Sequence, residues 1–186
     1  MTMHPDTLPD DKETVILVDE NDEAIGTAGK LEVHLDARLH RAVSVFAVTS
    51  AGELIIQKRA AAKYHSAGKW ANTACGHPRP GEPLEAAARR RMRAELGFEA
   101  PLTHGFSTLY KADCGNGLTE HELVHVFFCK TDEAPSPVPS EVERVRSVSL
   151  AQVRQELASS RDEFAVWFQF YLDEHFDDLQ REINKL

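Results

Sequence analysis

The stretch that decides the fold is Asn72-Thr73-Ala74-Cys75-Gly76-His77-Pro78. A thiol and an imidazole flank one glycine, and in an extended segment residues i and i+2 point to the same face. Cys75 and His77 are therefore predicted to face one pocket, and Gly76 would let the backbone or a ligand come close. For an isolated pair, the simpler interpretation is a buried cysteine beside a structural histidine, so the rest of the chain must decide.

Length and composition favour one globular domain. The chain has 186 residues, of which 42% are hydrophobic and 27% charged, enough for a real core. Residues 1–13 are polar, carry acids and prolines, and lack the basic and apolar regions of a secretion signal, so we expect a flexible tail. Residues 14–186 are predicted to form the single domain.

The charge and the cysteines limit the possible partners. No apolar run approaches the roughly 18 residues of a membrane span. The net charge of -9 argues against nucleic acid as the main partner, because phosphate binding needs a basic surface. There are three cysteines and no CxxC motif, which indicates reduced thiols in a cytoplasmic protein. We expect a monomer that binds a small molecule.

The order of predicted elements indicates an α+β fold with a mixed, largely antiparallel sheet. His40 opens a continuous apolar run typical of a buried strand, and Gly97 is placed to end a helix in the left-handed conformation. Segment 30–39 is mixed, and 59–69 is predicted as a loop. Strands are predicted over 14–18, 23–27, 41–48, 54–58, 70–74, 102–112, 118–130 and 142–150, and helices over 84–96, 151–157 and 161–184.

Two side-chain patterns stand out. Alternation along 118–130 places Glu120 and Glu122 on one face of a strand. The stripe of Phe164, Trp167, Phe168, Tyr171 and Leu172 at helical spacing is mainly core.

A set of imidazoles and carboxylates suits a divalent ion such as Zn²⁺, Mn²⁺ or Fe²⁺. By composition alone, six further histidines are equally available: His4, His65, His104, His121, His125 and His175. The candidate ligands are His34, His40, His77, Glu120 and Glu122.

The helix after Cys75 carries a second motif. Gly76, Glu82, Arg90, Glu95, Gly97 and Phe98 stand at the spacing of the Nudix signature, and the chain resembles the Nudix superfamily with an altered box. Arg91 replaces the first acid after the signature arginine, and Ala94 replaces one of the two adjacent acids. Nudix hydrolases use those acids to hold Mg²⁺ beside a diphosphate, so hydrolysis by that route is disfavoured.

Several features taken together indicate a narrower family within this superfamily. The stretch 72–78, the altered box, Arg38-Leu39-His40, the Glu120/Glu122 pair and Trp167 resemble the type I isopentenyl diphosphate isomerases over most of the chain. The resemblance implies a Nudix-like α/β/α sandwich that interconverts isopentenyl and dimethylallyl diphosphates.

The resemblance also implies roles for individual residues. Cys75 and Glu122 would face opposite sides of the reacting carbons, Tyr110 would assist the acid/base chemistry, and Trp167 would lie against the alkene. One divalent metal, Mn²⁺ or Zn²⁺, would be held by His34, His40, His77, Glu120 and Glu122. A Mg²⁺ would be shared by Glu95, the backbone carbonyl of Cys75 and the diphosphate. The diphosphate would be held by Lys30, Arg59, Lys63 and Arg91.

The chemistry suits these groups. Moving a carbon–carbon double bond adds a proton at one carbon and removes one from another, which needs an acid and a base. The tertiary carbocation between these steps needs a dry pocket and an electron-rich neighbour such as an indole. Arg91 would then face the site, whereas Arg89, Arg90 and Arg93 are expected to be structural or solvated.

Three other functions remain to be separated from isomerisation. A Nudix-type hydrolase would release phosphate or pyrophosphate from its substrate. A metal- or diphosphate-binding module would bind without turnover and leaves the presence of Cys75 and Trp167 unexplained. A cysteine-nucleophile enzyme would form a covalent intermediate at Cys75, yet no oxyanion motif is visible.

Overall fold

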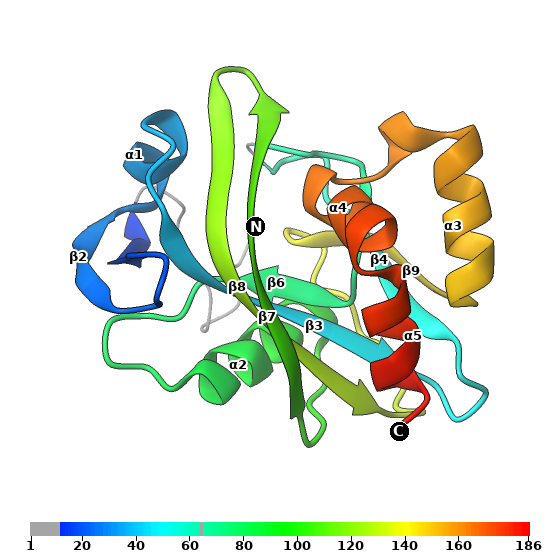
Figure 1. Ribbon diagram of the computed structural model, residues 1–186. Coiled ribbons are helices and arrows are strands. Elements are labelled where there is room, and N and C mark those ends of the chain that lie inside the picture. The colour runs from blue at the N-terminus through cyan, green and yellow to red at the C-terminus, as the bar shows by residue number, and fades with distance from the viewer. Residues whose placement is uncertain (1–11, 64) are drawn as a thin grey trace.

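A computed structural model describes residues 12–63 and 65–186. The strands of this part belong to one mixed sheet, and helices lie on both of its faces (Figure 1). The strands are β1 (Thr14–Val18), β2 (Ala24–Gly29), β3 (His40–Val48), β4 (Leu54–Arg59), β5 (Trp70–Ala71), β6 (Ala74–Gly76), β7 (Thr103–Gly115), β8 (Leu118–Lys130) and β9 (Val142–Val148). The helices are α1 (Lys30–Leu35), α2 (Leu84–Leu96), α3 (Leu150–Ser159), the 3₁₀ turn η2 (Arg161–Glu163), α4 (Val166–Glu174) and α5 (Phe176–Ile183).

Strand β3 is the centre of the sheet. It pairs with β1, β4 and β6 in the antiparallel sense and with β8 in the parallel sense. Its apolar run is buried along almost its whole length, as expected for a strand covered on both faces. The parallel register sets His40 beside Glu122, which brings together two of the predicted metal ligands.

Alternate residues of β3 enter two separate cores. Val43, Val45 and Ala47 pack with α2 on one face, whereas Ala42 and Phe46 pack with α3, α4 and α5 on the other. The predicted α/β/α sandwich with a largely antiparallel sheet is therefore confirmed. Within α2, Ala87, Ala88, Met92 and Leu96 are buried, whereas Ala86 is exposed.

The prediction of one long helix over 161–184 is wrong. The chain forms η2, α4 and α5, with a break at His175, whose φ of -121° is not helical. The His175 ring lies between Thr108 Oγ1 on β7, at 2.9 Å, and Asp178 Oδ2, at 2.8 Å. These two contacts accompany the turn of the chain at His175. The helical spacing of apolar residues continues across this turn, so the sequence pattern did not reveal it. No helix in the described part of the chain is long and apolar enough to span a membrane.

The start of the domain also differs from the prediction. Most of the predicted tail lies outside the described residues, but its last residue, Glu13, is 7% exposed. The mixed segment after Gly29 begins with the short helix α1, which the sequence did not predict. Lys30 N donates to Glu13 O at 2.9 Å, so Glu13 is fixed to the first residue of that helix.

Gly105 sits where two strands and a helix crowd together. A Cβ at this position would lie 2.4 Å from Phe128 Cε2 and 3.1 Å from Glu182 Cγ. Phe128 is buried in the core and has little room to move, so Gly105→Ala is expected to lower the free energy of unfolding by about 1–3 kcal/mol. Urea denaturation of the two proteins measures the difference.

Gly29→Ala is the matched control. Its φ of -66° suits alanine, and its new Cβ would meet nothing closer than 4.0 Å. We expect a loss below about 1 kcal/mol there. Equal losses in the two variants would contradict the crowding at Gly105.

Candidate active site and metal centre

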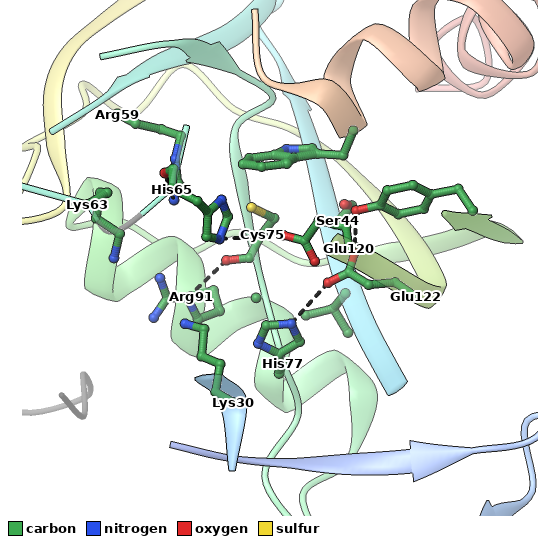
Figure 2. A pocket seen from close by; sticks show the side chains of 14 residues that line it. Lys30, Ser44, Arg59, Lys63, His65, Cys75, His77, Arg91, Glu120 and Glu122 are labelled. Atoms are coloured by element: carbon green, nitrogen blue, oxygen red, sulfur yellow. Dashed lines mark hydrogen bonds and ion pairs between the residues drawn. The ribbon is translucent and has the colours of Figure 1, made fainter. Parts of the chain in front are cut away.

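One pocket collects the side chains that the sequence marked as catalytic or substrate-binding (Figure 2). It encloses about 470 Å³ with its open mouth included. In the view of Figure 2 the cations gather on one side and the acids Glu120 and Glu122 on the other. The predicted residues that line it are Lys30, Arg59, Lys63, Cys75, His77, Arg91, Tyr110, Glu120, Glu122 and Trp167.

The Cys75-Gly76-His77 segment behaves as its spacing predicts. Cys75 lies on the short strand β6, opposite Ser44 of β3, and both Cys75 and His77 line the pocket. The close approach at Gly76 is made by Arg91, because a Cβ on Gly76 would lie 2.8 Å from Arg91 Cδ and Nε. The missing side chain lets Arg91 Nε donate to the carbonyl of Cys75 at 3.0 Å.

Four of the five predicted metal ligands form a tight cluster. Nitrogen or oxygen atoms of His34, His40, His77 and Glu120 all lie within 4.8 Å of one another, and all four residues are buried. In His34 and His40 the Nδ1 atoms contact the carbonyls of Lys30 and Arg38, at 2.6 Å and 2.9 Å. An imidazole that donates one N–H to a carbonyl presents its other nitrogen as a ligand, so Nε2 of each ring is available to a metal.

Glu122, the fifth predicted ligand, adjoins this cluster. Its Oε1 lies 3.0 Å from His77 Nε2 and 3.6 Å from His40 Nε2, and its Oε2 accepts a hydrogen bond of 2.6 Å from the Tyr110 hydroxyl. The contacts with His40 and Tyr110 follow from strand register, because Glu122 of β8 is opposite His40 of β3 and Tyr110 of β7. The carboxylate therefore touches the metal cluster on one side and a proton-bearing phenol on the other.

The donor set fits a divalent ion. Nε2 of His40 is buried and makes no hydrogen bond within the described residues, which is costly unless a ligand completes the site. Burial lowers the pKa of His77 to about 4, despite its bond to Glu122, so the ring is neutral at pH 7 as a metal ligand must be. Three imidazoles with one or two carboxylates suit an ion of the Zn²⁺ or Mn²⁺ type.

Protonation differs sharply among the proposed acid and base groups. Burial and the nearby charge of Glu95 raise the pKa of Cys75 to about 12, so the side chain is a thiol at neutral pH. Burial alone would raise the pKa of Glu122, but its contacts with the His40 and His77 rings hold this pKa well below its usual range. Burial and the charge of Glu122 raise the pKa of Tyr110. The pocket thus contains a thiol, a phenol and a carboxylate.

The predicted magnesium ligands meet at Arg91. The Cys75 carbonyl and Glu95 Oε1 both accept from Arg91 Nε at 3.0 Å, so one cationic group already lies between the two oxygens. Glu95 is 2% exposed, and its other oxygen accepts from Gln57. Oxygen donors are those Mg²⁺ prefers, so the donor set fits the ion.

The arginines of the altered Nudix box lie in different surroundings. Arg91 extends from α2 into the pocket, as expected. Arg90 instead forms a two-pronged pair with Glu82, with both contacts at 2.7 Å, and donates to the carbonyl of His77 at 3.0 Å. Arg89 and Arg93 pair with exposed acids, so their predicted structural or solvated positions are confirmed.

Two acids near the cations were missed at the sequence level. Glu13 Oε2 lies 2.6 Å from Lys30 Nζ. Glu141 Oε2 lies 2.9 Å from Lys63 Nζ and 3.3 Å from Arg91. Both acids are buried, and they neutralise cations that were predicted to hold a diphosphate. Neither acid belongs to a local motif, so only tertiary structure reveals them.

The buried ion pair of Glu13 leads us to predict how the free energy of unfolding changes at acid pH. Burial alone would raise its pKa, but the charges of Lys30, His77 and Arg91 lower it below its usual value of 4.5. A depressed folded-state pKa adds stability above about pH 4.5 and loses it as the pH falls toward the folded value. Glu13→Gln is therefore expected to cost about 1.5–3 kcal/mol at pH 7, and less as the pH falls below 4.5.

Urea denaturation of the metal-free proteins at pH 7 and pH 4 measures the effect. The control is Glu32→Gln, which breaks an exposed pair with Arg38 at 2.8 Å and should cost less than about 1 kcal/mol. A loss for Glu13→Gln that is independent of pH would contradict the ion pair.

The indole of Trp167 forms part of the pocket wall. Its indole Nε1 donates to Asn72 Oδ1 at 3.1 Å, so the ring is held by the first residue of the segment that also carries Cys75 and His77. The guanidinium of Arg59 lies 5.0 Å from the centre of the ring, so the indole already attracts a cation. His65 packs edge-on against the same indole at 5.7 Å. The sequence offered His65 only as one of several available histidines.

Comparison with known proteins agrees with this site. A NUDIX domain family model matches residues 38–168. The chain is 46% identical over 162 residues to isopentenyl-diphosphate Delta-isomerase 1 of Aromatoleum aromaticum, covering 87% of this chain and 92% of that one. It is 44% identical over 160 residues to the isopentenyl-diphosphate Delta-isomerase of Streptomyces griseus, covering 84% and 80%.

Solved structures show the same fold. The crystal structure of DR0079 from Deinococcus radiodurans superposes with a TM-score of 0.70 at 20% identity, covering 93% of this chain and 98% of that one. A MutT protein from Methanosarcina mazei superposes with a TM-score of 0.62 at 18% identity, covering 77% and 96%. The sandwich, the matched domain and the curated relatives together place the chain in the NUDIX family, among the isopentenyl-diphosphate Delta-isomerases.

Proposed function

We propose that this chain is an isopentenyl-diphosphate Delta-isomerase that interconverts isopentenyl diphosphate and dimethylallyl diphosphate in isoprenoid biosynthesis. The observation that carries the proposal is one pocket holding the Cys75 thiol, the Tyr110–Glu122 pair, the Trp167 indole and four cations. These are the groups that protonation, deprotonation, cation shielding and diphosphate anchoring require.

The protonation states of Cys75 and Glu122 provide both a proton donor and a proton acceptor. Cys75 carries a proton that it can donate, and Glu122 is a carboxylate that can accept one. Tyr110 is hydrogen-bonded to Glu122 and can relay a proton to or from it. After one turnover Cys75 is a thiolate and Glu122 is protonated, which is the state that the reverse reaction needs. Proton exchange with water returns the pair to the thiol and the carboxylate.

Trp167 and the enclosing walls protect the intermediate. The tertiary carbocation would be captured by water in an open site, and the burial of Tyr110 and Trp167 around the half-buried Cys75 favours a dry reaction centre. An indole face stabilises a desolvated cation by about 2 kcal/mol. The bond from Asn72 holds that face in place.

The diphosphate is an anchor rather than a reacting group. Lys30, Arg59, Lys63 and Arg91 line the pocket, and charge-assisted contacts to phosphate orient the five-carbon chain. Mg²⁺ on Glu95 and the Cys75 carbonyl would neutralise part of the diphosphate charge. An ion of the Mn²⁺ or Zn²⁺ type on His34, His40, His77, Glu120 and Glu122 would fix the Glu122 carboxylate and alter its acidity.

We also infer that the enzyme acts in the cytoplasm as a monomer that binds no nucleic acid. The three cysteines form no disulfide, which suits a reducing compartment. The net charge of -9 opposes binding to nucleic acid.

Proton NMR of isopentenyl diphosphate in deuterated water tests the function. The protein loaded with divalent metal is expected to convert the substrate and to incorporate deuterium, and a chelator is expected to stop both. A phosphate assay on the same samples separates isomerisation from Nudix-type hydrolysis. Release of phosphate or pyrophosphate without movement of the double bond would overturn the proposal.

A further inference from the structure

We propose that the chain holds a second metal site, formed by His65, Cys114 and Glu120, for a thiophilic divalent ion such as Zn²⁺. Ligand atoms of these three residues lie within 4.8 Å of one another. The group is separate from the cluster of three histidines described above, and it shares only Glu120 with that cluster. It adds a sulfur donor that the first site lacks.

Three separate elements bring the ligands together. His65 lies in the loop between β4 and β5, where Arg59 NH2 donates to the carbonyl of His65 at 3.4 Å. Glu120 is on β8, directly opposite Ala112 of β7. Cys114 lies two residues beyond Ala112, near the end of β7.

A β-bulge shapes the position of Cys114. The register of β7 and β8 shifts between Asp113 and Gly115, so Cys114 is the extra residue at the end of the hairpin. Such bulges re-aim side chains and recur beside functional sites. At this bulge the thiol lies within 4.8 Å of both His65 and Glu120 ligand atoms.

The geometry of Glu120 suits a shared ligand. Its Oε2 lies 3.0 Å from His34 Nε2, in the first cluster, whereas its Oε1 lies 3.5 Å from His65 Nε2, in the second. The two oxygens of one carboxylate thus point to imidazoles of different sites. The rings of His34 and His65 are 5.7 Å apart. A carboxylate in this arrangement can bridge two ions, as in two-metal centres.

The donor chemistry selects the ion. A thiolate, an imidazole and a carboxylate together favour Zn²⁺ and similar borderline ions over Mg²⁺. The thiol of Cys114 gives up its proton to solvent when it becomes a ligand. Cys114 is half-buried, so an ion can reach it from solution, whereas His65 and Glu120 are buried.

Titration of the chelator-treated protein with Co²⁺ tests the site. The first cluster contains no sulfur, so a thiolate-to-cobalt charge-transfer band in the near ultraviolet reports only a site with a cysteine ligand. We expect two equivalents of Co²⁺ to bind the native protein, one of them with this band. Cys114→Ser should remove the band and one equivalent and leave the other in place.

A second variant tests whether the three residues act together. His65→Gln should weaken the sulfur-containing site at least about tenfold, because loss of a ligand costs no less than loss of an outer-shell partner. The cysteine control is Cys129→Ala, which lies in the core behind α2 and should leave the band unchanged. Thermal unfolding of each protein confirms that it is folded.

Three results would overturn the proposal. One is a single equivalent of Co²⁺ without a charge-transfer band. Another is a band that survives Cys114→Ser but disappears in Cys75→Ala, which would assign the thiolate to the pocket cysteine. The third is unchanged affinity in His65→Gln, which would leave Cys114 as a thiol that binds cobalt on its own. None of these readouts depends on isomerase activity, so they are independent of the proposed function.

Discussion

Cys75→Ala is expected to slow isomerisation by roughly 10²–10⁴-fold, the range for a positioned general acid or base. The thiol is the proton-bearing group on one side of the pocket, because its pKa is raised to about 12, and alanine carries no transferable proton. The fold and the metal content should persist, because the metal cluster consists of other side chains. Proton NMR of substrate conversion and metal analysis of the same sample measure both.

Cys129→Ala provides the control for loss of a thiol away from the pocket. Cys129 is buried on the opposite face of the sheet, against the α2 layer, so this variant should turn over at the native rate. Near-native turnover in Cys75→Ala would remove Cys75 from the catalytic groups.

Glu122→Gln is expected to lose both activity and affinity for the metal. The carboxylate contacts His40 and His77 and accepts from Tyr110, so one substitution removes a negative ligand and the proton acceptor together. Loss of a general base costs about 10²–10⁴-fold, and a weaker metal site adds to that loss. Metal analysis after dialysis and the NMR assay report the two effects separately.

The matched control is Glu143→Gln. Glu143 is an exposed acid on β9 that pairs with Lys58 at 3.4 Å, and its replacement should change neither quantity. If Glu122→Gln retained its metal and its turnover, Glu122 would be neither a ligand nor a base.

The sequence predicts the strands of this protein better than its helix ends. The apolar, β-branched run after His40 is a strong local signal for β3, and it is correct. Helix α1 is short and lacks an apolar period, so residues 30–35 gave no helical signal. The break at His175 depends on contacts with Thr108 and Asp178, of which the one to Thr108 joins segments far apart in the chain.

The residues of the site also divide into those with a local sequence signal and those without one. Cys75 and His77 follow from a spacing of two, and Glu120 and Glu122 follow from strand alternation. His34 and His40 were candidate ligands by residue type alone, and only the family resemblance preferred them to the other histidines. Glu13 and Glu141 matter only because the fold buries them beside cations, and no single-sequence pattern records such a pairing.

The parallel pairing of β3 with β8 has a consequence for folding. The proposed ligands His40 and Glu122 become neighbours only when these two strands align, so the unfolded chain would contain no assembled metal site. An ion that binds the native state alone stabilises it by mass action, by about 4 kcal/mol at a thousandfold excess over the dissociation constant. If the proposed site binds its ion, we expect the resistance of this protein to heat and proteolysis to rise with the supply of metal.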